Sequence, residues 1–125
     1  MLLNLTNHPY ENWQDEQKQE ALRRWERVED CPFPVVSPEW DTEQVSAFAS
    51  ETVRKTMAMK PDAVLCQGEM CLTFSMIADF QRQGVPVFAA TSERVSMEVN
   101  QPDGSIRKQA VFRFVRFREY ERIGG

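Results

Sequence analysis

The sequence has no long apolar run, only five glycines and a single histidine. No stretch reaches the roughly 18 consecutive apolar residues of a membrane-spanning helix, and the first residues lack the basic start and apolar core of a signal peptide. We therefore expect a cytoplasmic protein with no membrane partner. The glycine-rich fingerprints of dinucleotide-binding and Walker-type sites are also missing, which disfavours both kinds of nucleotide binding.

Cysteine is scarce, and its spacing excludes several kinds of site. The three cysteines cannot all pair, and no CxxC motif is present, so free thiols in a reducing compartment are expected. Cys66 lies in an apolar segment and should be core. Cys71 falls in the first turn of a predicted helix, where the helix dipole can lower a thiol pKa. Because His8 is the only histidine, neither a catalytic thiol nor a zinc site is favoured, and no cofactor or metal is expected.

Negative charge exceeds positive charge, but unevenly along the chain. The net charge is −4, whereas residues 105–125 carry six basic and only two acidic side chains. An acidic chain is a poor general ligand for nucleic acids, so we expect no binding to duplex nucleic acid. The basic C-terminal segment still leaves room for one local anion site.

Hydrophobic periodicity predicts one domain over residues 1–125, in which strands and helices alternate. Strands are expected at 2–6, near 27–30, at 63–66 and at 85–90, and helices at 14–26, from Asp41 or Thr42 to Met57, and from Met70 to a C-cap at Gly84. This order predicts an α/β fold with a mostly parallel sheet flanked by three helices.

The last part of the chain predicts a different arrangement. Segments 95–99 and 106–117 flank the turn-like sequence Asn100–Gly104, which is typical of a C-terminal antiparallel β-hairpin. Alternation along the second segment places Val111, Val115 and Phe117 on one face and Phe112 and Phe114 on the other. Residues 91–94 are expected to form the connection between the fourth parallel strand and this hairpin.

Polar groups follow three of the predicted strands. They are Asn7-His8 after the first, Gln67-Gly68-Glu69 after the third and Thr91-Ser92-Glu93-Arg94 after the fourth. Open parallel sheets bind ligands beyond the carboxyl ends of their strands, so these groups form a candidate site. Gly68 would permit close backbone approach or an unusual φ, and the helix N-terminus after it would suit a phosphate. The alternative is that these residues only cap a helix and form turns.

Two of these residues are candidates for chemistry. His8 can donate to a ligand or act as a general acid, and Glu69 can act as a base, although one carboxylate does not define a magnesium site. Four arginines have the planar guanidinium that matches phosphate oxygens, or they form a solvated strand face: Arg94, Arg113, Arg116 and Arg118.

Four segments of the sequence resemble small CRISPR-associated accessory proteins of the ring nuclease type. They are LLNLTNHP, VLCQGEMCLTF, VPVFAATSERV and FRFVRFREY, and the resemblance spans most of the chain in order. It implies a Rossmann-like domain related to cyclic-oligoadenylate sensor domains. It also implies a homodimer that binds cyclic oligoadenylate, an antiviral second messenger, across its two-fold axis.

The resemblance further implies a metal-independent phosphodiesterase reaction. A ribose 2′-hydroxyl attacks the neighbouring phosphate and leaves a 2′,3′-cyclic phosphate end, and the protein aligns the reacting atoms and stabilises the developing charge. Carried over to this sequence, the catalytic residues would be His8 and Glu69, and the ligand-binding residues Asn7, Gln67, Gly68, Thr91, Ser92 and Arg94. The alternatives are a module of the same fold that senses or sequesters the ligand without cutting it, and an unrelated α/β interaction protein.

Overall fold

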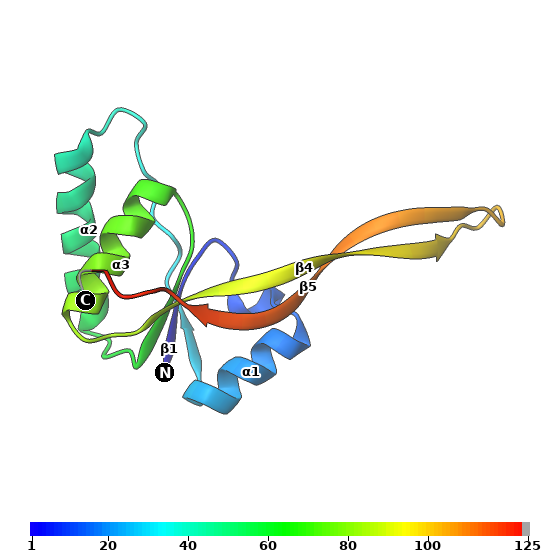
Figure 1. Ribbon diagram of the computed structural model, residues 1–125, viewed down its shortest axis with the longest axis horizontal. Coiled ribbons are helices and arrows are strands. Elements are labelled where there is room, and N and C mark those ends of the chain that lie inside the picture. Colours follow the sequence, from blue (N-terminus) through cyan, green and yellow to red (C-terminus); the bar gives the residue numbers. More distant parts are fainter. Residues whose placement is uncertain (124–125) are drawn as a thin grey trace.

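Strands and helices alternate along the first 90 residues, and this alternation produces a sheet with helices on both faces. The computed structural model describes residues 1–123 (Figure 1). Its elements are β1 (Leu2–Leu5), η1 (Tyr10–Asn12, a 3-10 turn), α1 (Asp15–Trp25), β2 (Val28–Asp30), α2 (Thr42–Met57), β3 (Ala63–Cys66), α3 (Met70–Arg82), β4 (Val87–Asn100) and β5 (Ile106–Glu119). The sheet order is β2-β1-β3-β4-β5. Strands β1 to β4 are parallel and β5 is antiparallel to β4, so the predicted α/β architecture is confirmed.

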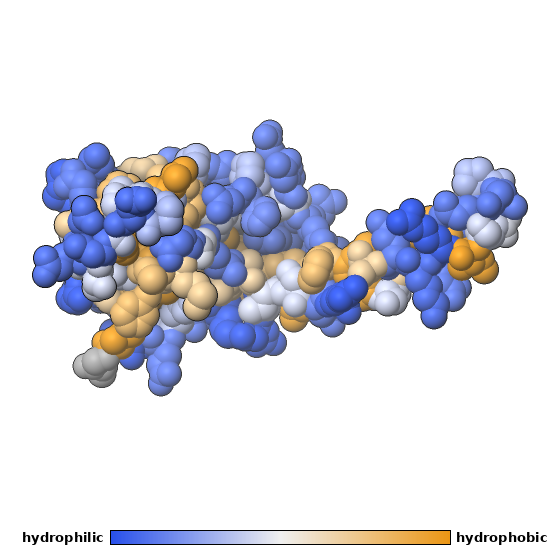
Figure 2. All heavy atoms as spheres, turned by 90° about the horizontal axis from the view of Figure 1, so that it is seen from above, coloured by the Kyte–Doolittle hydropathy of each residue, from blue (hydrophilic) through white to orange (hydrophobic). Residues whose placement is uncertain are grey.

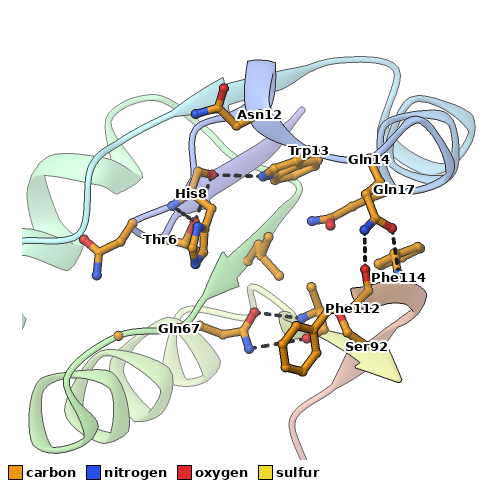
Figure 3. Close-up of a pocket in the computed structure, with 14 residues that line it drawn as sticks. Thr6, His8, Asn12, Trp13, Gln14, Gln17, Gln67, Ser92, Phe112 and Phe114 are labelled. Atoms are coloured by element: carbon orange, nitrogen blue, oxygen red, sulfur yellow. Dashed lines mark hydrogen bonds between the residues drawn. The ribbon is translucent and has the colours of Figure 1, made fainter. Parts of the chain in front are cut away.

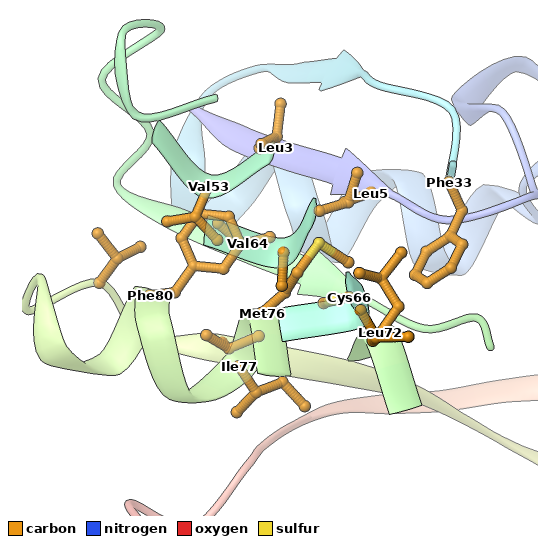
Figure 4. Close-up of a cluster of buried hydrophobic side chains, with 14 of the residues drawn as sticks. Leu3, Leu5, Phe33, Val53, Val64, Cys66, Leu72, Met76, Ile77 and Phe80 are labelled. Atoms are coloured by element: carbon orange, nitrogen blue, oxygen red, sulfur yellow. The ribbon is translucent and has the colours of Figure 1, made fainter. Parts of the chain in front are cut away.

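The two central strands, β1 and β3, are buried at every position. Leu3 and Leu5 face α2 and α3, where they pack in a core that includes Phe80 (Figure 4). Leu2 and Leu65 face the opposite side and pack with α1. A parallel strand covered on both faces must be apolar at nearly every position, which explains the uninterrupted apolar runs in the sequence.

The helices begin and end where the sequence places their caps. The Asp41 side chain accepts the Gln44 N–H, and the Gln44 side chain accepts the Asp41 N–H, which completes a capping box at the start of α2. Gly84 follows α3 with a φ of +79°, the left-handed conformation that glycine adopts most readily. Within residues 1–123, none of the helices combines the length and apolar character that crossing a bilayer requires.

The expectation of a connection at residues 91–94 is wrong. β4 continues without a break from Val87 to Asn100, because β5 pairs with it along the whole of this length. The predicted fourth strand and the first hairpin strand are therefore one strand. Polar residues at 91–94 do not end it, since a strand that leaves the body of the protein needs no apolar side chains on its solvated faces.

The predicted faces of β5 are also wrong at Phe114 and Phe117. Thr91 pairs with Arg116 and Ser92 with Phe114, so Val115 is an extra residue in β5 and forms a bulge. The bulge shifts the alternation by one residue. As a result Phe114 and Phe117 point to the same face and pack together, with ring centroids 5.0 Å apart. The exposed Val115 has no place in that cluster.

From Ser92 to Phe114, β4 and β5 continue as a two-stranded ribbon, which we call the arm and whose base still contacts the body. The arm projects away from α2 and α3 and ends in a tight turn (Figure 1). In that turn the Gln101 N–H donates to the Ser105 carbonyl at 2.8 Å, and Gly104 has a φ of +85°. No other element of the described residues pairs with β4 beyond Phe88 on the side of β3. The β4 edge of the arm is therefore free.

Candidate functional site

The centre of the candidate site is the point where β1 and β3 end side by side. The chain leaves β1 through α1 towards β2, and it leaves β3 through α3 towards β4. The two connections diverge to opposite faces of the sheet, and open α/β sheets bind ligands at such switch points. A cleft of about 550 Å³ opens here, between the first loop, the start of α1 and the base of the arm (Figure 3).

The first wall of the cleft is a loop that a buried asparagine holds in place. The Asn4 side chain donates to the His8 carbonyl and to Asp30 Oδ1, both at 2.8 Å. The Thr6 hydroxyl donates to Asn4 Oδ1 at 2.8 Å and accepts the His8 N–H at 3.1 Å. Trp13 Nε1 adds a second donor to the His8 carbonyl at 2.9 Å. The backbone of His8 is thus fixed, while its side chain is exposed.

The second wall is the end of β3, where Gln67 has a structural contact. Its side chain accepts the Ala90 N–H at 2.9 Å and directs its Nε2 to the Ala90 carbonyl at 3.4 Å. These bonds extend the pairing between β3 and β4 beyond the last ladder pair, Leu65 and Phe88. In Figure 3, Gln67 and His8 lie on opposite walls of the cleft.

The close approach predicted at Gly68 is real, but the neighbour is the protein itself. A Cβ added to Gly68 would lie 2.5 Å from three atoms of the Phe33 ring. Phe33 is buried and belongs to the core on the α2 and α3 side of the sheet. The glycine is therefore required by packing against an aromatic ring, and its φ is not among the positive values.

Glu69 does not line the cleft, because it caps its own helix. Its carboxylate accepts the N–H of Cys71 at 2.5 Å and that of Leu72 at 3.1 Å. The backbone bond from Cys71 is the largest cause of a lowered pKa for this carboxyl group. A carboxylate in this position occupies two of the donors that a phosphate would use, so its contacts match the alternative in which Glu69 caps its helix and weigh against an anion site at the N-terminus of α3.

The residues of β4 divide between the cleft and the arm. Ser92 lines the cleft. Thr91 does not, and its hydroxyl donates to the Arg116 carbonyl across the strand pair at 3.0 Å. Arg94 is exposed and pairs with Phe112, so it shares the face of Ser92 one pleat further out. Five of the eight predicted site residues therefore meet at the cleft: Asn7, His8, Gln67, Gly68 and Ser92.

The third wall comes from segments that the sequence did not single out. Gln14, just before α1, donates to the Phe112 carbonyl at 2.5 Å and accepts the Phe114 N–H at 2.9 Å. It pairs with β5 as a neighbouring strand would. Phe112 is 65% exposed at the mouth of the cleft, whereas Phe114 is buried. The bond partners of Gln14 are about a hundred residues away in sequence, so no local pattern could have indicated them.

The cleft is rich in amides and poor in charge. Its lining includes the amide side chains of Asn7, Asn12, Gln14, Gln17 and Gln67 and the aromatic rings of Trp13, Phe112 and Phe114. Within residues 1–123, no lysine, arginine, aspartate or glutamate lines the cleft. His8 is the one lining residue there with an acid–base side chain. Such a surface matches a polar, planar, hydrogen-bonding ligand better than a bare anion.

The thiols and carboxylates do not form a second centre. In the part of the chain that the structure describes, no group of three or more histidine, cysteine or acidic residues is placed to hold a metal ion. Cys66 is buried, and burial raises the pKa of its thiol to about 12, which makes it unreactive. Cys71 is exposed but faces a different groove, next to Trp40 and Phe74.

Comparison with known proteins gives one family. No curated protein and no solved structure matches the chain. A family model matches residues 1–118, which is nearly the whole length, and its description is the uncharacterized protein MJ1673 family. The chain therefore belongs to the MJ1673 family.

Proposed function

We propose that the cleft binds the adenine nucleotides of a cyclic oligoadenylate and that the protein opens the ring as a metal-independent phosphodiesterase. The single observation that carries this proposal is the meeting of amide side chains, aromatic rings and one imidazole at the switch point of the sheet. The strand order β2-β1-β3-β4, with helices on both faces, supports a Rossmann-like classification. The resemblance of four segments to CRISPR-associated ring nucleases supplies the ligand class.

Recognition of the base follows from the chemistry of the lining. An asparagine or glutamine side chain can donate and accept at once, which matches the N6 and N7 edge of adenine. Asn7, Asn12 and Gln17 are the amides of the cleft best suited to this role, since Gln14 and Gln67 already bond to the backbone. The exposed ring of Phe112 offers a flat surface on which a base can stack.

The proposed reaction requires little more than alignment and one proton carrier. The ribose 2′-oxygen forms a bond to phosphorus, the bond from phosphorus to the 5′-oxygen breaks, and the 5′-oxygen takes up a proton. Holding the three reacting atoms in line supplies much of the acceleration. His8 is the side chain of the cleft that can accept the 2′-hydroxyl proton or donate to the leaving oxygen. Glu69 has no part in this scheme, because its carboxylate caps α3.

One observation favours the second candidate, a module that binds or sequesters the ring without cutting it. Within residues 1–123, no lysine or arginine lines the cleft of a single protomer, although charge develops on the phosphoryl oxygens during cleavage. Arg94 is the basic residue of β4, and it lies on the same face of the strand as Ser92, which lines the cleft. A homodimer, which a two-fold ligand favours, would supply every group twice.

The test is incubation with cyclic tri-, tetra- and hexa-adenylate in EDTA, followed by separation of the products. Linear products with 2′,3′-cyclic phosphate ends, lost in His8→Ala, support the nuclease. Thermal stabilisation by one ring size without product supports the binding module. Absence of both product and stabilisation with all three rings contradicts the whole proposal. Glu69→Gln is the matched control, and it should retain cleavage because Glu69 lies outside the cleft.

A further inference from the structure

The arm has an apolar face that nothing in the described chain covers. The side chains of Val95, Met97 and Val99 alternate onto one face of β4, and Val111 lies opposite Val95 on β5. Met97 is 48% and Val99 37% exposed. Figure 2 shows apolar side chains at the surface along the arm. An isolated two-stranded ribbon of this kind is at best marginally stable in water, so the arm requires a covering surface.

The body has a second uncovered apolar surface, the groove between the N-terminal ends of α2 and α3. This groove, which we call the α2–α3 groove, has a volume of about 360 Å³ and is lined by Trp40, Val45, Met70, Cys71 and Phe74 among others. Met70 is 83% and Phe74 64% exposed. They are four residues apart on α3 and therefore lie on the same side of the helix. Figure 1 places α2 and α3 at one end of the molecule and the tip of the arm at the other, so an arm does not reach its own groove.

The distribution of charge indicates which partner covers the apolar face of the arm and the α2–α3 groove. The arm carries four basic and three acidic side chains, whereas the rest of the chain carries eleven basic and sixteen acidic ones. Two arms therefore have net charges of the same sign, while an arm and the body of another copy have net charges of opposite sign and attract. Asp41 lines the groove and Glu69 precedes Met70. On the arm, Arg107 lies opposite Val99, on the apolar face.

Contact area points in the same direction. Nine residues of β4, from Ser92 to Asn100, span roughly 30 Å, so one face of the two-stranded arm measures roughly 30 by 10 Å. A single arm-on-arm contact of this size is small beside the roughly 800 Å² that each partner buries in a stable interface. An exchange, in which each copy gives an arm and receives one, provides two such contacts related by a two-fold axis.

We propose that the chain forms a homodimer by arm exchange, in which the apolar face of each arm packs in the α2–α3 groove of a second copy. This inference has the homodimer in common with the proposed function. It does not require that the cleft binds a nucleotide. The arrangement brings the two uncovered apolar surfaces together and places Arg107 of the arm near the acidic rim of the groove.

A disulfide experiment tests the contact, because Cys71 is the exposed cysteine and lines the groove. In Met97→Cys, mild oxidation should produce a covalent dimer that disappears when Cys71→Ser is added. Ser96→Cys, on the opposite face of the same strand, is the matched control and should give less than about a tenth as much covalent dimer. Equal cross-linking of the two variants overturns the proposal, as does a dimer of Met97→Cys that persists without Cys71.

Sedimentation provides the second readout. The wild-type protein should be a dimer at tens of micromolar, and Met97→Asp should raise the dimer dissociation constant more than about tenfold. Circular dichroism should show that the variant keeps its fold. A monomeric wild type overturns the inference. A dimer that Met97→Asp leaves intact overturns the arm contact, while the cleft can still be tested with cyclic oligoadenylate, so the two failures remain distinguishable.

Discussion

The side chain of Gln67 bonds to the backbone of Ala90 and continues the pairing of β3 with β4 after the last backbone pair of the two strands. It accepts the Ala90 N–H at 2.9 Å, at the point where β3 no longer reaches β4. Gln14 makes the same kind of contact with Phe112 and Phe114 of β5. Two glutamines thus bind the base of the arm to the body, one on each side of the cleft.

The Gln67 contact leads to a prediction about stability. Gln67→Ala leaves the Ala90 N–H without its acceptor, so we expect the free energy of unfolding to fall by roughly 1–2 kcal/mol. Gln17→Ala is the control, a cleft-lining glutamine on α1 whose removal should change stability by less than about 0.5 kcal/mol. Urea unfolding monitored by tryptophan fluorescence measures both. Equal losses in the two variants would contradict the structural role of Gln67.

Gly68 is predicted to be intolerant of even one added carbon. Because its Cβ would meet the buried Phe33 ring, Gly68→Ala should cost roughly 1–3 kcal/mol of stability. The same substitution in a Phe33→Leu background should cost less, since the smaller side chain leaves space. A double-mutant cycle from thermal or urea unfolding gives the coupling between the two sites. Additive effects would show that the ring is not the obstacle.

Glu69 is expected to act through the stability of α3, with a defined dependence on pH. Accepting the N–H groups of Cys71 and Leu72 lowers the pKa of Glu69 below its ordinary value of 4.5. The charged form therefore stabilises the fold fully above pH 4.5, and this contribution is lost as the pH falls through the lowered pKa of the folded state. Glu69→Ala should cost roughly 1 kcal/mol near neutral pH.

The measurement is the difference in unfolding free energy between wild type and Glu69→Ala from pH 7 down to about pH 3. The difference should shrink at the acidic end. Glu39→Ala removes an exposed carboxylate outside the helices and should show no such trend. A difference that stays constant with pH would rule out the charged cap.

The two phenylalanines on the cleft face of β5 should separate binding from folding. Phe114 is 8% exposed and packs on Phe117, so Phe114→Ala should lower the free energy of unfolding by roughly 3–5 kcal/mol. Phe112 is 65% exposed, and its removal should leave stability nearly unchanged. If a base stacks on it, Phe112→Ala should weaken nucleotide binding by roughly 1–3 kcal/mol. Calorimetric titration with cyclic oligoadenylate measures this loss, and unaltered affinity would remove Phe112 from the site.

The sequence determined those features that depend on neighbouring residues. Apolar runs, a cap at Asp41 or Thr42 and the glycine at position 84 predicted the parallel strands, the start of α2 and the end of α3. Each of these signals reflects contacts within a few residues, or burial on both faces of a strand. They also placed Asn7, His8 and Gln67 at the carboxyl edge of the sheet, where the cleft lies.

Tertiary structure decided what pairing between distant segments controls. The polar residues 91–94 predict a loop, but β5 supplies partners for their backbone groups, so β4 continues into the arm. The bulge at Val115 brings Phe114 and Phe117 to one face, which strict alternation does not allow. Glu69 became a helix cap and Gly68 a contact of Phe33, because each met its partner only once the chain had folded. Local sequence thus determined the helices and strands and the carboxyl edge of the sheet at which the cleft lies. Long-range backbone pairing and packing determined which residues line the cleft.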